Sequence, residues 1–156
     1  MKPMLLHGLS AALMIGAAVT AAWQAWAGGD LVHFPEDYRR GVHYATVNRG
    51  NIREELFTSR EAIEAVKRGE PFPSGTVITM EDHRGGELHR FVVMEKRAGW
   101  GAEYPPAQRN GEWEYRSFAP DRTVNTGENL ARCFSCHKSR EGQDFVWTAD
   151  RMRNTP

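Results

Sequence analysis

Two cysteines and a histidine lie close together near the C-terminal end of the chain. In the stretch LARCFSCHKS, residues 130–139, two residues separate Cys133 from Cys136, and His137 follows directly. The spacing C-x-x-C-H is that of covalent haem attachment, in which the sulfurs form thioethers with the haem vinyl groups and the histidine binds the iron. The sequence contains no other cysteine. We therefore predict one covalently attached haem c, bound through Cys133, Cys136 and His137.

Other chemistries of a cysteine pair fit the sequence less well. A structural zinc site needs four ligands, and no second cysteine pair or paired-histidine spacing accompanies His33, His43, His83 and His89. A thioredoxin-like pair opens a helix after a strand, whereas this pair lies near the C-terminus. A disulfide across two residues closes a very small loop and adds little stability. It stays open as the alternative in an oxidising compartment.

The first thirty residues predict export. Lys2 precedes an apolar, alanine-rich run over residues 5–22, and Ala25 and Ala27 form the A-x-A pattern of a signal-peptidase site. The run is nearly long enough to span a bilayer, so an uncleaved anchor is the alternative. We predict a signal peptide over residues 1–27, a single domain over residues 28–156, and a periplasmic protein without membrane attachment after cleavage.

The charge balance excludes nucleic acid as a partner. The chain has 20 basic and 20 acidic residues, a formal net charge of 0, and the two signs alternate along the sequence. A nucleic-acid interface would need a basic patch or stripe.

Local patterns predict an α+β domain, mainly an antiparallel sheet with flanking helices. Helices are predicted over residues 34–41 and 58–69, where Thr58 and Glu61 have capping-box spacing. The β-branched runs 75–82 and 87–97, joined through HRGG, predict a hairpin. Alternation over residues 111–120 predicts a half-buried strand, and residues 42–47 a further strand. Asn125 and Glu128 also have capping-box spacing, which predicts the start of the haem helix near the C-terminus.

Several segments together resemble the cytochrome P-460 family, with which the sheet-rich cytochromes c′-beta are grouped. They are FPEDYRRG, EPFPSGTVITMED, FVVMEKRAGWGAEYP, NGEWEYRSF and CFSCHKSREGQDFVWT, in this order and over nearly all of residues 28–156. The resemblance implies a mainly β fold, a homodimer, and a five-coordinate haem c whose distal face is open. It also implies a small nitrogen ligand: hydroxylamine, which P-460 members oxidise, or nitric oxide, which c′-beta members bind behind an aromatic cap.

The lysines bear on which branch of the family the chain resembles. The P-460 haem carries a cross-link from a lysine side chain, and Lys96 is the candidate for it because it is the one lysine on a predicted strand inside a matching segment. The resemblance places the family's lysine on the preceding strand, where this chain has TMEDHRGG and no lysine. We therefore expect Lys96 to be a structural or surface residue and the cross-link to be absent.

Other residues are candidates for the distal side of the haem. Glu103 lies where the resemblance implies a distal carboxylate, which could accept protons as a general base; a solvated loop residue is the alternative. An aromatic cap could come from Phe34, Phe57, Phe72 or Phe91, although ordinary core packing is the commoner role for each. The alternative function is electron transfer to a redox partner protein, with Met80, Met94 or one of His43, His83 and His89 as second axial ligand.

Overall fold

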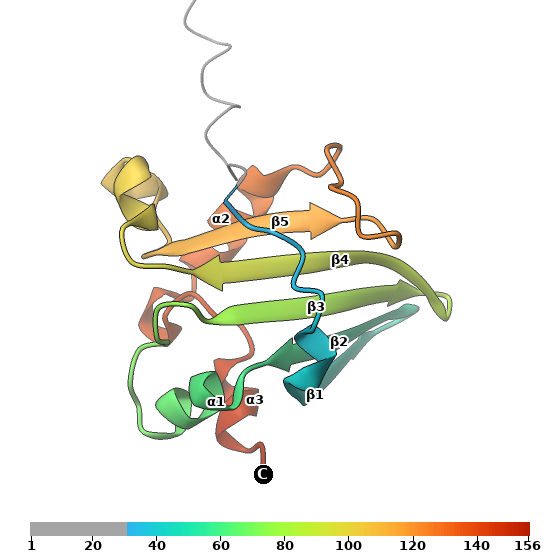
Figure 1. Cartoon of the computed structure of the whole chain (residues 1–156), viewed down its shortest axis with the longest axis horizontal. Coiled ribbons are helices and arrows are strands. Elements are labelled where there is room, and N and C mark those ends of the chain that lie inside the picture. The colour runs from blue at the N-terminus through green and yellow to red at the C-terminus, as the bar shows by residue number, and fades with distance from the viewer. Residues whose placement is uncertain (1–30) are drawn as a thin grey trace, which may run out of the picture.

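Five antiparallel strands form one sheet in the order of the sequence (Figure 1). The computed structural model describes residues 31–156, except for the side chain of Glu103. The strands are β1 (Val42–Arg49), β2 (Ile52–Thr58), β3 (Val77–Arg84), β4 (Glu87–Lys96) and β5 (Trp113–Phe118). The helices are α1 (Arg60–Lys67), α2 (Leu130–Lys138) and α3 (Ala149–Arg153), with short 3₁₀ turns η1 (Tyr38–Arg40), η2 (Trp100–Glu103), η3 (Pro106–Gln108) and η4 (Glu141–Gln143). The α+β class with a mainly antiparallel sheet is confirmed.

Both faces of the sheet are covered, because successive residues of a strand point to opposite sides. Helices α2 and α3 lie behind the sheet in Figure 1, and residues 31–40 cross in front of it. The helix-covered face carries Leu56 paired with Met80, and Met94 paired with Tyr115. The main core lies here, with buried members Leu56, Ile63, Ile78, Met94, Trp113, Tyr115, Phe134, Val146 and Met152.

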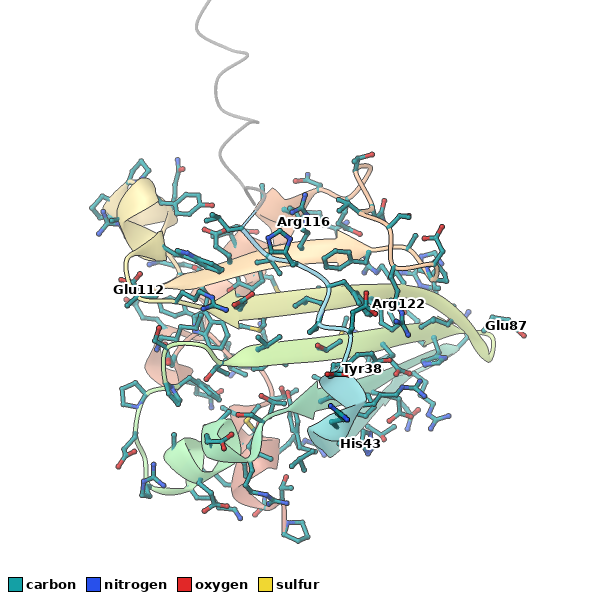
Figure 2. All side chains as sticks on the ribbon, viewed as in Figure 1. Tyr38, His43, Glu87, Glu112, Arg116 and Arg122 are labelled. Carbon is teal, nitrogen blue, oxygen red and sulfur yellow. The ribbon has the colours of Figure 1, made fainter. Side chains whose placement is uncertain are left out.

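The opposite face carries a smaller core beneath the N-terminal segment. Val32, Phe91, Val93 and Phe118 are its buried members, and Phe34 and Tyr38 pack against them. Figure 2 shows Tyr38 and His43 on this near side, where both rings contact Phe57. The sheet therefore separates two cores, of which the larger faces the cysteine-bearing helix.

Some local predictions hold. The β3–β4 hairpin turns through Gly85 and Gly86, whose φ angles of 58° and 92° are those of the tight hairpin turn that favours glycine at both positions. Helix α1 buries Ala62, Ile63 and Val66 as its apolar stripe.

Other local predictions are wrong, and in each case a tertiary contact is the cause. Residues 34–41 are helical only at η1, because Phe34 instead packs on Phe91 at 4.9 Å and Phe118 at 5.4 Å between ring centroids. Thr58 ends β2, and Ser59 caps α1 by accepting from the Ala62 N–H at 3.2 Å.

The start of α2 also differs from the prediction. The helix begins at Leu130 after Asn129, and no side chain caps it. Asn125 closes a turn by accepting from the Gly127 N–H, and Glu128 forms an ion pair with Arg90 of β4. The Asn125–Glu128 capping box therefore does not form.

The predicted signal peptide and its cleavage site after Ala27 lie outside the described residues. Within residues 31–156, no helix has the length and apolar character needed to cross a membrane.

Candidate functional site

Helix α2 presents all three residues of the C-x-x-C-H motif. Residues three or four apart in a helix share a face, so Cys133 lies beside both Cys136 and His137. The two cysteines are free thiols, not a disulfide. Cys133 and His137 are half-buried and Cys136 is exposed. The motif therefore faces partly into the protein and partly toward its surface.

Aromatic packing fixes α2 beside β5. Phe134, the buried residue of the helix, contacts the ring of Tyr115 at 4.8 Å and the ring of Tyr104 at 5.2 Å. The buried Asn110 side chain donates to the Phe134 carbonyl at 2.8 Å and to the Tyr115 hydroxyl at 3.0 Å. Phe134 and its carbonyl thus fix the helix beside β5 without using either cysteine.

The ring of His137 is held in one orientation. Its Nδ1 lies 2.6 Å from the Phe145 carbonyl oxygen, and since a carbonyl can only accept, Nδ1 donates. The ring also contacts Tyr115 at 4.9 Å between centroids. Burial lowers the pKa of His137, which favours the neutral imidazole. The lone pair then lies on Nε2, the arrangement found in metal-binding histidines.

An unusual turn supplies the Phe145 carbonyl. Asp144 and Phe145 have positive φ angles of 50° and 62°, a left-handed conformation that is uncommon in non-glycine residues. The Asp144 carboxylate accepts from Lys96 Nζ at 2.6 Å and from the Phe72 N–H at 2.9 Å. These contacts tie the turn to the end of β4 and to the loop after α1.

A cavity of about 500 Å³ lies between the motif and the sheet. The sheet contributes an apolar floor of Leu56, Ile78, Met80, Val92 and Met94, while Cys133, Cys136 and His137 contribute part of the wall. The remaining lining residues are Val47, Arg49, Glu54, Tyr115, Val146, Trp147, Thr148, Asp150 and Arg151. Its volume and apolar lining are typical of a cofactor site.

The placement of cysteines and arginines at opposite sides of the cavity fits a haem. Helix α2 packs on β5, whereas α3 packs on β1, at the other edge of the sheet. The cysteines therefore lie at one side, and Arg49 of β1 and Arg151 of α3 at the other. A haem attached through its vinyl groups directs its two carboxylates away from the thioethers, and arginine is well suited to bind carboxylates. Arg49 and Arg151 could hold them.

Three carboxylates border this site: Glu54 and the exposed Asp150 line the cavity, and Glu128 acts on the Cys133 thiol. Glu54 lines the cavity, is 8% exposed and forms an ion pair with Arg49. Burial raises the pKa of Glu54 more than Arg49 lowers it. Glu128 pairs with Arg90, and its charge adds to the effect of burial in raising the pKa of the Cys133 thiol. Neither Glu54 nor Glu128 was predicted from the sequence as a site residue, because a buried carboxylate in a strand and a half-buried one in a loop have no local pattern that indicates such a role.

No described contact links Lys96 or Glu103 to Cys133, Cys136 or His137. Lys96 is 13% exposed and pairs with Asp144. The described residues that line the cavity include no lysine; Lys67 pairs with Glu64, and Lys138 donates to the Arg109 carbonyl. Glu103 ends η2, and its side chain lies outside the described part of the chain. A distal role for Glu103 stays a prediction.

The candidate axial ligands divide between the two faces of the sheet. Met80 and Met94 line the cavity. His43 and His83 are bonded to Glu55 at 2.6 Å and to Glu81 at 2.9 Å, and these glutamates alternate with Leu56 and Met80 and so face the other way. Neither histidine can reach the cavity, and the exposed His89 does not line it.

The four phenylalanines considered as an aromatic cap lie elsewhere in the fold. Phe34 and Phe91 belong to the opposite core, Phe57 contacts Tyr38 there, and Phe72 packs on Trp113 at 5.5 Å. None of these four lines the cavity. The aromatic side chains that do line it are Tyr115 and Trp147.

Comparison with known proteins identifies a family. The family model described as Cytochrome P460 matches residues 35–148, which is more than half of the chain and includes the motif, the sheet and the turn at residues 144–145. No curated protein matches.

Proposed function

Because the chain belongs to the cytochrome P460 family, we propose that it carries one haem c, attached through Cys133 and Cys136 and bound at its iron by His137. The opposite face of the haem stays open to a small nitrogen species, nitric oxide or hydroxylamine. The proposal includes a periplasmic location after cleavage of residues 1–27, a homodimer and a redox partner protein, all of which follow from the leader and the family resemblance.

One observation carries the proposal. His137 donates from Nδ1 to the Phe145 carbonyl at 2.6 Å, on the wall of an apolar cavity that both cysteines also line. This hydrogen bond leaves Nε2 as the ring atom that can bind a metal. A histidine that served only to stabilise the core would not need a cavity of about 500 Å³ beside it.

The residues around the cavity would have different roles once a haem is bound. The bound haem would supply an iron with one exchangeable coordination position. Leu56, Ile78 and Val92 exclude water from the cavity floor, so that a small and weakly polar molecule competes well for the site. Arg49 and Arg151 would hold the haem carboxylates.

The lining favours ligand binding over hydroxylamine oxidation. The resemblance ties that oxidation to a lysine cross-link, and β3, the strand where the family lysine is expected, presents Ile78 and Met80 to the cavity. Oxidation would also need a proton acceptor. Glu54 and Asp150 line the cavity, Glu128 acts on the Cys133 thiol, and Glu103 is the carboxylate predicted from the sequence.

A second function, electron transfer, is favoured by one observation. Met80 and Met94 both line the cavity, and a thioether bound opposite His137 would give a Met/His haem of the electron-transfer type. Such a ligand would close the iron to nitric oxide.

The test compares Met80→Leu and Met94→Leu with Met152→Leu. Met152 is a buried core methionine that does not line the cavity, which makes it a matched control. We expect all three reduced variants to keep the wild-type absorption spectrum and to bind nitric oxide with similar affinity. A change from a sharp low-spin to a high-spin spectrum in the Met80 or Met94 variant alone would overturn the open site and support electron transfer.

A further inference from the structure

We infer that the Lys96–Asp144 ion pair positions the proximal ligand by holding the turn whose Phe145 carbonyl accepts from His137. This inference rests on the proposed haem ligation by His137. It gives Lys96 a role at the haem that involves no cross-link. Lys96 and Asp144 act through the turn and do not themselves contact the imidazole.

The chain of contacts is continuous. Lys96 Nζ lies 2.6 Å from Asp144 Oδ2, and the two side chains are 13% and 20% exposed. The same oxygen accepts from the Phe72 N–H at 2.9 Å. The next residue, Phe145, donates its N–H to the Arg140 carbonyl at 2.8 Å and accepts from His137 at 2.6 Å. Only one peptide unit therefore separates the ion pair from the hydrogen bond that orients the imidazole.

The turn needs external support. Two consecutive residues with positive φ cost energy when neither is glycine. Asp144 tolerates this conformation better than Phe145, whose φ is 62°. The Phe145 ring packs against Gly111, where an added Cβ would come within 3.0 Å of it. The ion pair fixes one end of the strained segment, and this contact fixes the other.

The position of the pair explains why lysine occurs here. Lys96 ends β4 beside Trp113, whose ring centroid is 5.9 Å from Nζ. The Lys96 side chain is largely buried, so its charge is stable only with a counter-charge. Asp144 provides that charge, and the pair thereby connects the sheet to the segment that follows α2.

A donated hydrogen bond from Nδ1 makes a histidine a stronger iron ligand. A weaker Nδ1–H···O bond would give a weaker iron–histidine bond, and would favour the reduced iron because less electron density reaches the metal. The pair should therefore influence two haem properties, the iron–histidine stretching frequency and the midpoint potential.

The experiment uses the haem-loaded full-length protein and the variants Asp144→Asn, Lys96→Gln and Lys96→Arg. Asparagine tolerates positive φ, so Asp144→Asn removes the charge and keeps the turn residue compatible. We expect Asp144→Asn and Lys96→Gln each to lower the iron–histidine stretching frequency and to raise the midpoint potential. Lys96→Arg keeps the positive charge and should stay close to the wild type in both quantities. The double variant should shift the frequency and the potential no further than either single variant does, since both substitutions remove the same interaction.

Glu64→Gln is the matched control, because it removes a surface lysine–carboxylate pair in α1. Wild-type frequency and potential in both Asp144→Asn and Lys96→Gln, with only a loss of stability, would overturn the inference. A wild-type protein without covalent haem would instead overturn the proposed function, and with it this inference. If Asp144→Asn does not fold, Lys96→Gln decides alone.

Discussion

Glu114 of β5 is a carboxylate buried in the protein. It is fully buried, lies opposite Glu95 of β4 on the side away from the motif, and has a hydrogen bond with Tyr104. Burial raises the pKa of Glu114 to about 7, against an ordinary value of 4.5, and the hydrogen bond only partly offsets this. The folded protein therefore binds a proton at Glu114 under conditions where the unfolded chain releases it.

The predicted consequence is that the contribution of Glu114 to stability falls as pH rises. Because the folded pKa exceeds the unfolded one, the contribution of Glu114 is fully present below about pH 4.5 and is lost as pH rises through about 7. Over this interval the free energy of unfolding of the wild type should fall by up to about 3 kcal/mol more than that of Glu114→Gln, whose side chain cannot ionise. Urea unfolding at several pH values measures the difference.

Glu141→Gln, at an exposed position in η4, is the control and should follow the wild type. An identical pH dependence in Glu114→Gln and the wild type would contradict a protonated Glu114.

At the scale of elements, the boundaries of α1 show where local patterns mislead. Thr58 and Ser59 are both suitable capping residues by type. Register decides between them, since Thr58 pairs with Val42 and Ile78 and donates its hydroxyl to the Val77 carbonyl at 2.8 Å. Ser59 is the first residue free to cap the helix.

Ser59→Ala should destabilise the protein by about 1 kcal/mol, because the Ala62 N–H loses its acceptor. Ser135→Ala, at an exposed position inside α2, should change the free energy of unfolding by less. Chemical denaturation measures both. Equal effects of the two substitutions would contradict the assignment of Ser59 as the cap.

Strand β2 could not be predicted, for a related reason. Its sequence IREELFT places Glu54 and Glu55 side by side, and both are buried. Each meets a partner from a neighbouring strand or turn, Arg49 for Glu54 and Thr46 for Glu55. Tertiary pairing thus makes a strand from residues with low strand propensity, whereas the β-branched strands β3 and β4 are recognisable locally.

At the scale of the whole molecule, the candidate haem-binding residues can be predicted from the sequence, whereas the contacts that orient them cannot. The C-x-x-C-H motif predicts Cys133, Cys136 and His137 by type and spacing alone. The carbonyl that orients His137 is backbone, and Asp144 joins Lys96 across 48 residues. No local pattern indicates contacts of that kind.

The division of the fold between two cores has a functional meaning. The smaller core beneath residues 31–40 contains Phe34 and Phe91, two of the four phenylalanines considered as a cap, and Phe72 is buried in the larger core away from the cavity lining. The larger core contains the cavity, so its floor consists of Leu56, Ile78, Met80, Val92 and Met94. The candidate site thus combines the histidine and cysteines of the cytochrome P460 family with a lining that has no described lysine and no capping phenylalanine.

The most direct test of this account is the visible absorption spectrum of the purified protein after reduction with dithionite. We predict the spectrum of an ordinary high-spin haem c, which changes on addition of nitric oxide. Absence of haem absorption would contradict the cofactor assignment. A broad, strongly red-shifted Soret band would contradict the absence of a lysine cross-link, and sharp low-spin α and β bands would contradict the open iron.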